Sequence, residues 1–262
     1  MARAELVLIA AIALAAPAGI AAVQGTPRQQ TSPPAQEQPT LLTKAETARV
    51  RAYNDGIVEA VKRLPQRVSL AALIEPLMQL AETRSAAGGK ATDENRAAIL
   101  ALAVYVNGRK LAVLIPESRT WPRPESRALT LHQRGDLAQH FTMSAAIGAT
   151  AGAPIADLIG LAKELDDARR GSGFSFADLA ADRAGTTFGL RATEAEPGAR
   201  DLQSRIETGF AENHMMPEVT GLPENMSEAD FKTRYRGIRS PEYTRMLDEI
   251  ERRIAALPIF QR

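Results

Sequence analysis

The chain of 262 residues contains no cysteine and has almost no net charge. The absence of cysteine excludes disulfide bonds, thiolate metal ligands, a cysteine nucleophile and a lipid anchor attached to cysteine. Its 32 Lys and Arg residues against 31 Asp and Glu residues leave a formal charge of +1, and no arginine-rich run with interleaved aromatics occurs. Both observations argue against a nucleic-acid partner. A hydrophobic fraction of 45% is instead typical of an ordinary globular protein.

A long uninterrupted hydrophobic run is also missing. The most apolar segment, residues 6–23, is broken by Pro17 and Gly19, whereas a membrane-spanning helix needs about 20 apolar residues. A short polar start with Arg3, an apolar core and an exit of small residues are typical of a secretory signal peptide. We therefore expect residues 1–23 to be a signal peptide, with an uncleaved anchor and a cytosolic location as the alternatives. The expected location is periplasmic, or tethered on the periplasmic side, with membrane contact only through an uncleaved N-terminal segment.

Residues 24–42 are rich in Pro, Gln, Thr and Ser and have no apolar period, which predicts a flexible tether. Residues 43–262 are expected to form a single globular domain of the mainly α class, a helical bundle with at most one short β pair. Its centre is the segment 129–189, where polar residues lie among alanines and leucines, and its C-terminal helical extension is 199–262.

Capping residues, apolar periods and prolines predict the individual elements. Asn107-Gly108 permits either a hairpin turn or the end of a helix, and the alanine and leucine content before it favours the helix. Residues 111–115 and 128–132 could still form a short strand pair, and residues 214–225 are expected to be extended. The expected helices cover residues 43–64, 69–85, 93–106, 136–149, 154–168, 176–188 and 200–211, followed by two that begin after Ser227 and Ser240.

Small residues recur at four-residue steps in two of these helices, at Ser144, Gly148 and Gly152 and at Ala181, Gly185 and Gly189. Glycine lowers helix stability, so this placement indicates close approach of neighbouring helices. The alternative is that the helices simply tolerate these glycines.

Asp136 and His140 are four residues apart and share a helical face. A carboxylate in this position can orient the imidazole and raise its basicity, as in catalytic and metal-bound histidines. Alternatively, Asp136 favours the first turn of its helix because of the helix dipole, and His140 is a hydrogen-bonded core residue.

Glu164 and Asp167 also share a face, with Lys163 beside them. A carboxylate enclosed by the neighbouring leucines would have a raised pKa suited to proton transfer, which makes Glu164 a candidate acid. The alternative is a solvated face on which Lys163 pairs with Asp167.

Asp178 and Asp182 differ in how well local structure explains them. Ser175 is the expected N-cap of the next helix, so Asp178 is its third residue and completes a capping box. Asp182 has no such explanation, and its alanine neighbours indicate burial, which requires a partner for the charge. The candidate partners are His140, Lys163 and Arg183.

His140, Asp136, Asp178 and Asp182 offer one imidazole and three carboxylates, a set that suits Mg, Mn, Fe or Zn. The chain has no His-x-x-x-His or Glu-x-x-His pair, so we expect no cofactor, with a divalent metal as the alternative. No nucleophile elbow, P-loop or dinucleotide-binding glycine motif occurs in the required strand-to-helix context.

These residues resemble the YfiM-like family of bacterial periplasmic lipoproteins, whose function is itself uncharacterised. The family pattern is an Asp-x-x-x-His-Phe helix start, then Gly-Leu-x-Lys-Glu-x-x-Asp, then Gly-Ser-Gly-aromatic-Ser-x-x-Asp-Leu-x-x-Asp-x-x-Gly. The matching positions are Asp136, His140 and Phe141; Gly160, Leu161, Lys163, Glu164 and Asp167; and Gly171, Ser172, Gly173, Phe174, Ser175, Asp178, Leu179, Asp182 and Gly185.

The resemblance covers the central region alone and implies an envelope location with a shared polar cluster. Without cysteine, this chain departs from the lipidation that the family name implies. The same order of His, Glu and Asp is faintly similar to VanZ-like membrane proteins, although Pro154 and Asp157 speak against a membrane span in this region.

Two functions follow as expectations. The first is an exported envelope protein with a structural or binding role, in which the polar cluster sets helix register and the partner is an envelope component or another protein. The second is a hydrolase of a cell-envelope substrate, with His140 as base or metal ligand and Glu164 as acid, while Asp182 orients His140 or completes a metal site. A third interpretation makes the segment from His214 to Pro223 an exposed docking site for a partner.

Overall fold

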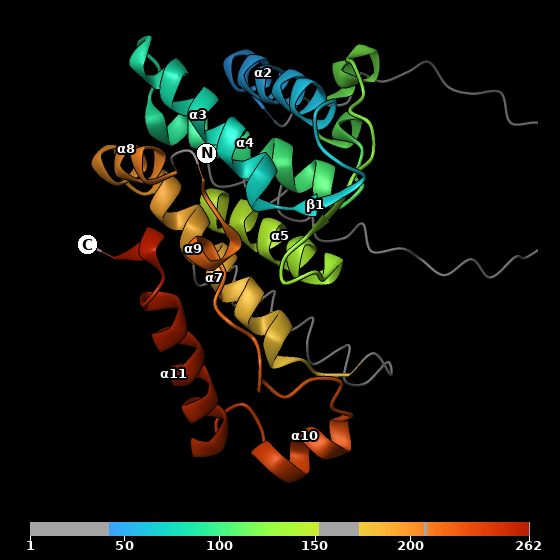
Figure 1. Cartoon of the computed structure of the whole chain (residues 1–262), viewed down its shortest axis with the longest axis vertical. Helices are drawn as coiled ribbons and strands as arrows, with labels where there is room; N and C mark the ends of the chain where they lie inside the picture. Colours follow the sequence, from blue (N-terminus) through green and yellow to red (C-terminus); the bar gives the residue numbers. More distant parts are fainter. Residues whose placement is uncertain (1–41, 152–172, 207–208, 262) are drawn as a thin grey trace, which may run out of the picture.

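The computed structural model describes residues 42–151, 173–206 and 209–261, which are mainly α-helical, as the sequence predicts (Figure 1). The expected signal peptide, nearly all of the tether and the predicted helix 154–168 lie outside these residues. The helices are α2 (Lys44–Val61), α3 (Ala71–Ala86), α4 (Ala91–Val106), α5 (Gly135–Ala151), α7 (Phe176–Thr193), α8 (Glu196–Arg205), α9 (Glu212–Met215), α10 (Glu228–Tyr235) and α11 (Pro241–Ala255). Short 3₁₀ helices cover Leu111–Val113, Pro116–Thr120 and Pro258–Phe260.

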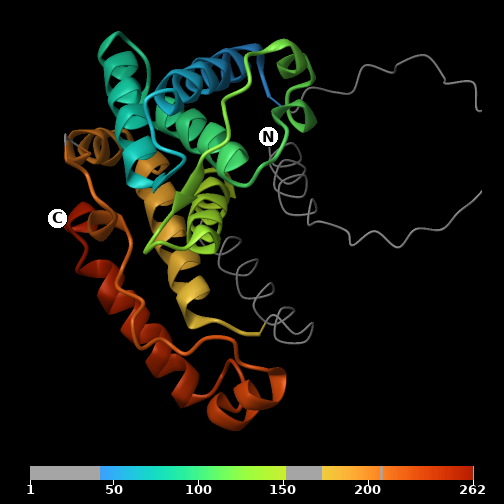
Figure 2. The ribbon, with the colours of Figure 1, turned by 45° about the vertical axis from the view of Figure 1, so that its right-hand side comes forward.

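Helix α4 lies at the centre of the bundle. It contacts α2 and α3 on one side and α5 and α7 on the other, so that the helices form three layers (Figures 1 and 2). Every residue from Ala97 to Val104 is buried, and half of them are alanine, whose small side chain lets neighbours approach from all directions. Helices α10 and α11 extend the fold beyond the N-terminal end of α7, which α11 contacts (Figure 2).

One short parallel strand pair is present among the described residues, but its partners differ from the prediction. Strand β2 (Ala128–Thr130) pairs with β1 (Arg67–Ser69), with Val68 opposite Leu129. The predicted partner of β2 was wrong, because Leu111–Val113 is a 3₁₀ helix and Pro116 begins the next one. The connection between α2 and α3 passes beside β2 instead, a contact that depends on tertiary packing.

The predicted helix boundaries are confirmed where capping residues define them. Thr43, Ser175, Ser227 and Ser240 each accept a hydrogen bond from the backbone N–H three residues on. Helix α4 ends at Val106 and Gly108 has a φ of 60°, which confirms the helix and excludes the hairpin.

Two predictions in the C-terminal part were inaccurate. Helix α8 begins at Glu196, four residues before the predicted start, because Pro197 is favourable in a first helical turn. It also ends at Arg205, well before the predicted residue 211. The first two residues of the predicted extended segment 214–225 belong to α9, and residues 216–225 contain no regular element.

Helix α4 receives its N-terminal cap from another helix. Lys90 at the N-cap position makes no side-chain hydrogen bond to the helix. Instead, the carboxylate of Glu196 in α8 accepts hydrogen bonds from the backbone N–H groups of Ala91 (2.9 Å) and Thr92 (3.3 Å). The hydrogen bond from Ala91 makes the largest contribution to holding the pKa of Glu196 below its ordinary value of 4.5.

We expect Glu196→Gln to lower the free energy of unfolding by about 1 kcal/mol at pH 7, because one of the two acceptor oxygens and the negative charge at the start of α4 are lost. Because the folded-state pKa of Glu196 is lowered, its contribution is fully present above pH 4.5 and disappears as the pH falls through the folded-state pKa. Urea unfolding at neutral and acid pH measures both effects. Glu82→Gln, at an exposed position of α3, is the control, and an equal loss in both variants would contradict the capping role.

Candidate functional site

A polar cluster lies where α5 and α7 pack together. His140 and Ser144 are one turn apart on α5, and Asp182 faces them from α7. Nδ1 of His140 lies 3.1 Å from Oδ1 of Asp182, and the same oxygen accepts a hydrogen bond of 2.7 Å from Oγ of Ser144. His140 and Asp182 are 9% and 6% exposed. The carboxylate thus joins two groups of the facing helix inside the protein.

Arg134, the residue before α5, extends this cluster towards the surface. Its Nη2 lies 2.7 Å from Oδ2 of Asp136 and 3.2 Å from Oδ1 of Asp178, and its Nη1 lies 2.5 Å from Oε2 of Glu224. The hydrogen bond with Asp136 is the main cause of a raised pKa of Arg134 and a lowered pKa of Asp136, so both side chains stay charged. Oδ2 of Asp178 lies 3.7 Å from Nε2 of His140. Asp178 therefore connects the buried part of the cluster with the more exposed group around Arg134.

Close backbone contact between α5 and α7 makes this side-chain geometry feasible. A Cβ atom on Gly185 would lie 2.1 Å from the carbonyl oxygen of Phe141, and one on Gly189 would lie 2.1 Å from that of Ala145. On the other helix, a Cβ on Gly148 would lie 2.8 Å from the carbonyl oxygen of Thr186. The predicted close approach is confirmed at these three glycines, and it brings short side chains such as Ser144 within reach of α7.

Asp136 does not orient His140, contrary to one of the two interpretations of their spacing. Its carboxylate pairs with Arg134 and accepts a hydrogen bond of 3.0 Å from the backbone N–H of Leu137. Asp136 lies in the first turn of α5, where the helix dipole favours negative charge. The carboxylate beside Nδ1 of His140 is instead that of Asp182, which lies on α7 and is 42 residues further along the chain.

Of the two candidate partners of Asp182 that the structure describes, His140 lies against its carboxylate. Arg183 forms an ion pair of 3.0 Å with Glu251. Lys163 lies outside the described residues, as do Glu164 and Asp167.

The capping role predicted at the start of α7 is confirmed for Ser175, whose Oγ accepts a hydrogen bond of 3.1 Å from the N–H of Asp178. Phe174 and Leu179, the two hydrophobic residues that flank the cap, are buried. Local capping does not explain the Asp178 side chain fully, since its carboxylate contacts Arg134 and His140.

The structure brings His140, Asp178 and Asp182 of the candidate metal set together and places Asp136 on Arg134. Among residues 42–151, 173–206 and 209–261, no group of three or more His, Asp or Glu is arranged to hold a metal ion. The other two histidines lie elsewhere: Nε2 of His132 is 2.9 Å from the carbonyl oxygen of Pro217, and His214 packs against Phe210.

Three members of the cluster were missed from the sequence. Arg134 stands two residues before Asp136, a spacing that gives no helical signal, and Glu224 is 90 residues away in an irregular segment. Ser144 stood out only as a small residue in the four-residue repeat. Their roles depend on which segments pack together.

The segment from His214 to Pro223 is not exposed as the docking interpretation expects, but packs along the core. Met215, Met216 and Leu222 are buried in the core. The same region continues into a backbone pair in which Phe174 and Met226 exchange hydrogen bonds of 2.7 Å and 3.0 Å. The segment therefore covers the start of α7 and holds Glu224 against Arg134.

In the part of the chain that the structure describes, no helix has the length and apolarity of a membrane span. The resemblance to the YfiM-like family depends on the residue pattern quoted above. No family model, curated protein or solved structure matches this chain.

Proposed function

We propose that this chain is an exported helical protein of the bacterial cell envelope with a structural or binding role. In this role, the network of His140, Ser144 and Asp182 keeps α5 and α7 in one register. The observation that carries the proposal is the burial of this network between two helices whose backbones touch.

The packing of small residues alone does not specify how α5 and α7 align along their length. Small residues repeat every four positions on both helices, so a shift by one turn would again place small residues opposite one another. The same shift would separate the imidazole and the hydroxyl from the carboxylate and leave buried polar groups without partners, at a cost of several kcal/mol. The polar network thus distinguishes between registers that apolar packing alone would leave similar in free energy.

The envelope location is supported by the composition of residues 1–23 and by the YfiM-like pattern. Because the chain has no cysteine, we propose that a cleaved signal or an uncleaved N-terminal segment replaces lipid attachment. An envelope component or another protein is the proposed partner.

A second candidate function is a hydrolase of an envelope substrate such as peptidoglycan or a lipid-linked phosphate. One observation favours it: Asp182 holds Nδ1 of His140, the arrangement by which a carboxylate orients a general base or a metal ligand. Glu164 would then serve as the acid.

Metal content and stability of His140→Ala separate the two functions. We expect no stoichiometric metal, by elemental mass spectrometry, in either protein purified without chelator. We also expect the melting temperature of the variant to fall by about 6–12 °C, since losing a buried charge partner costs about 3 kcal/mol in a domain of this size. The matched control is Gln139→Ala, at the neighbouring exposed position of α5, which should melt like the wild type. A metal at one per chain that is lost in a variant of unchanged stability would favour the hydrolase.

A further inference from the structure

The turn between α10 and α11, residues 236–240, lies at the end of the molecule opposite α2 and α3 (Figures 1 and 2). It carries Ile238, which is 39% exposed and is the one exposed large hydrophobic side chain in the part of the chain that the structure describes. Gly237 before it has a φ of 116°, a conformation that glycine adopts without strain and that reverses the chain sharply. The turn therefore presents an apolar side chain to solvent at one end of the fold.

The same region concentrates positive charge, although the whole chain has a formal charge of only +1. Residues 231–241 contain no carboxylate and four cations, which are Lys232, Arg234, Arg236 and Arg239. Lys232 pairs with Glu228 at 2.9 Å. The three arginines are exposed and form no ion pair with any residue that the structure describes. Three positive charges thus flank Ile238 along the chain without being neutralised by these residues.

Arg236 has a backbone conformation that is unfavourable for arginine. Its φ of 53° is left-handed, and its N–H donates to the carbonyl oxygen of Lys232 (2.9 Å) at the end of α10. Glycine or asparagine is usual in this conformation, because a larger side chain crowds the backbone. Since the local backbone disfavours arginine here, the outlier indicates a role for its side chain.

Aromatic packing holds the turn in place. Tyr235, just before it, lies with its ring centroid 5.6 Å from Phe231 and 4.8 Å from Phe176 of α7. Tyr243, just after it, lies 5.8 Å from Phe176. All four rings are buried. They support the turn but offer no exposed face for stacking on a nucleic-acid base, the contact by which proteins hold single strands.

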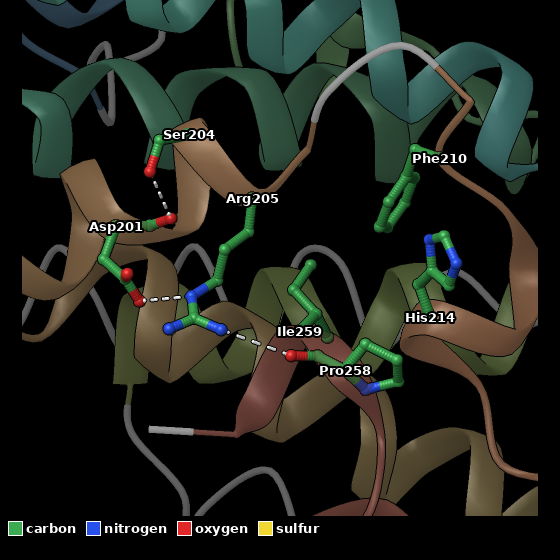
Figure 3. A pocket seen from close by; sticks show the side chains of 7 residues that line it. All are labelled: Asp201, Ser204, Arg205, Phe210, His214, Pro258 and Ile259. Carbon is green, nitrogen blue, oxygen red and sulfur yellow. Dashed lines mark hydrogen bonds and ion pairs between the residues drawn. The ribbon is translucent and has the colours of Figure 1, made fainter.

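The other end of α11 is fixed as well. The 3₁₀ helix Pro258–Phe260, which follows α11, lies against the end of α8 (Figure 3). There Nη1 of Arg205 donates to the carbonyl oxygen of Pro258 (3.4 Å), and Ile259 is buried. Because α11 is attached at both ends, the turn extends from a fixed support.

We propose that this turn contacts the surface of a membrane rich in anionic phospholipids. Ile238 enters the boundary between headgroups and acyl chains. The guanidinium groups of Arg234, Arg236 and Arg239 pair with lipid phosphates, which they bind through parallel hydrogen bonds.

The size of the surface favours lipid over an acidic protein. A stable protein interface buries about 800 Å² on each partner, far more than a turn of this length provides. A fluid lipid surface needs no complementary shape, so one apolar side chain with cations beside it is sufficient for a weak contact. This contact adds to any made by residues 1–23. It rests on the proposed envelope location and is independent of the His140 network.

Fluorescence at position 238 tests the proposal. Because the chain has no cysteine, Ile238→Cys provides a single thiol for an environment-sensitive nitrobenzoxadiazole label in the full-length protein. We expect its emission to rise with vesicles of equal parts phosphatidylglycerol and phosphatidylcholine, and to change little with phosphatidylcholine alone. The control is Glu82→Cys with the same label, at an exposed position of α3, which should not respond. Attachment through residues 1–23 is common to both proteins, so the comparison isolates the turn.

Two triple variants, labelled at position 238, test the charges. The first replaces the three arginines, by Arg234→Gln, Arg236→Gln and Arg239→Gln. It should need on the order of a hundredfold more lipid for half the response, since each cation near an anionic surface strengthens binding about fivefold. The matched control removes three exposed cations at or near α2 and α4, by Lys44→Gln, Arg63→Gln and Lys90→Gln. It should respond like the labelled protein without these changes.

Salt provides a measure that needs no triple variant. The response should disappear at about 1 M sodium chloride, where the screening length falls to about 3 Å.

Four results would overturn the proposal. They are an equal response to vesicles with and without phosphatidylglycerol, an equal response of the label at position 82, equal lipid dependence of the two triple variants, and an equal rise with poly-glutamate in place of vesicles. The last would assign the surface to an acidic polypeptide. None of these results depends on where the chain lies in the cell or on His140, so each leaves the proposed function intact.

Discussion

Replacement of Gly185 or Gly189 by alanine is expected to lower the free energy of unfolding by about 3 kcal/mol or more, because each new methyl group would overlap a backbone atom. Its Cβ would lie 2.1 Å from a carbonyl oxygen of α5 in either case. A backbone oxygen cannot move aside as a flexible side chain can, so α5 and α7 would have to separate. Separation would also lengthen the hydrogen bonds of Asp182 to His140 and Ser144.

The expected loss of stability has the opposite sign to the usual effect of replacing a helical glycine by alanine. In an ordinary helix, alanine in place of glycine stabilises the fold by about 0.5–1 kcal/mol. Gly198→Ala in α8 is the matched control, since its Cβ would lie 3.6 Å from the nearest atom, an ordinary contact. Urea unfolding of the three variants should show a large loss for Gly185→Ala and Gly189→Ala and none for Gly198→Ala. Wild-type stability of Gly185→Ala would mean that the two backbones do not touch.

Removal of the Asp182 carboxylate should be about as damaging, with a loss of roughly 3–5 kcal/mol for Asp182→Ala. The carboxylate is almost fully buried and accepts from Ser144 and His140 on one oxygen, so its loss leaves both groups without this acceptor. Ser144→Ala, which removes only a donor, should lose about 1 kcal/mol.

Asp182→Asn sharpens the test because it keeps the shape of the side chain. Oδ2 of Asp182 has no hydrogen-bond partner in the described part of the chain, so an amide nitrogen there would be a buried donor without an acceptor. We expect this variant to lose about 1–3 kcal/mol. Urea unfolding at neutral pH measures all three variants, and a double-mutant cycle with His140→Ala gives the coupling of the pair. A loss below about 1 kcal/mol for Asp182→Ala would be typical of a solvent-screened pair and would contradict the structural role.

Both predictions concern the same interface and separate its two components. The glycines determine how closely α5 and α7 approach, and the polar network determines which residues face one another. If both components stabilise the fold as expected, the central cluster is explained by helix register, and binding partners become the next question. If Asp182→Ala folds with the stability of the wild type, the result favours the hydrolase over the structural role.

Much of the local structure could be predicted from residues close together in the chain. Thr43, Ser175, Ser227 and Ser240 mark helix starts because a cap bonds to an amide only three residues away. Gly185 and Gly189 indicated close packing because glycine within a helix is unfavourable without a compensating contact. The burial of Asp182 and its pairing with a basic group followed from its alanine neighbours.

Within the residues that the structure describes, the sequence by itself therefore determined most of the helices and the helix starts that carry a capping residue, since each depends on interactions within about one helical turn. Only the tertiary structure decided the partners: Asp182 rather than Asp136 for His140, Arg67–Ser69 for the strand at Ala128–Thr130, Glu224 for Arg134 and Glu196 for the start of α4. These contacts join residues that are tens of positions apart, and their formation depends on how whole helices pack, which no local spacing specifies.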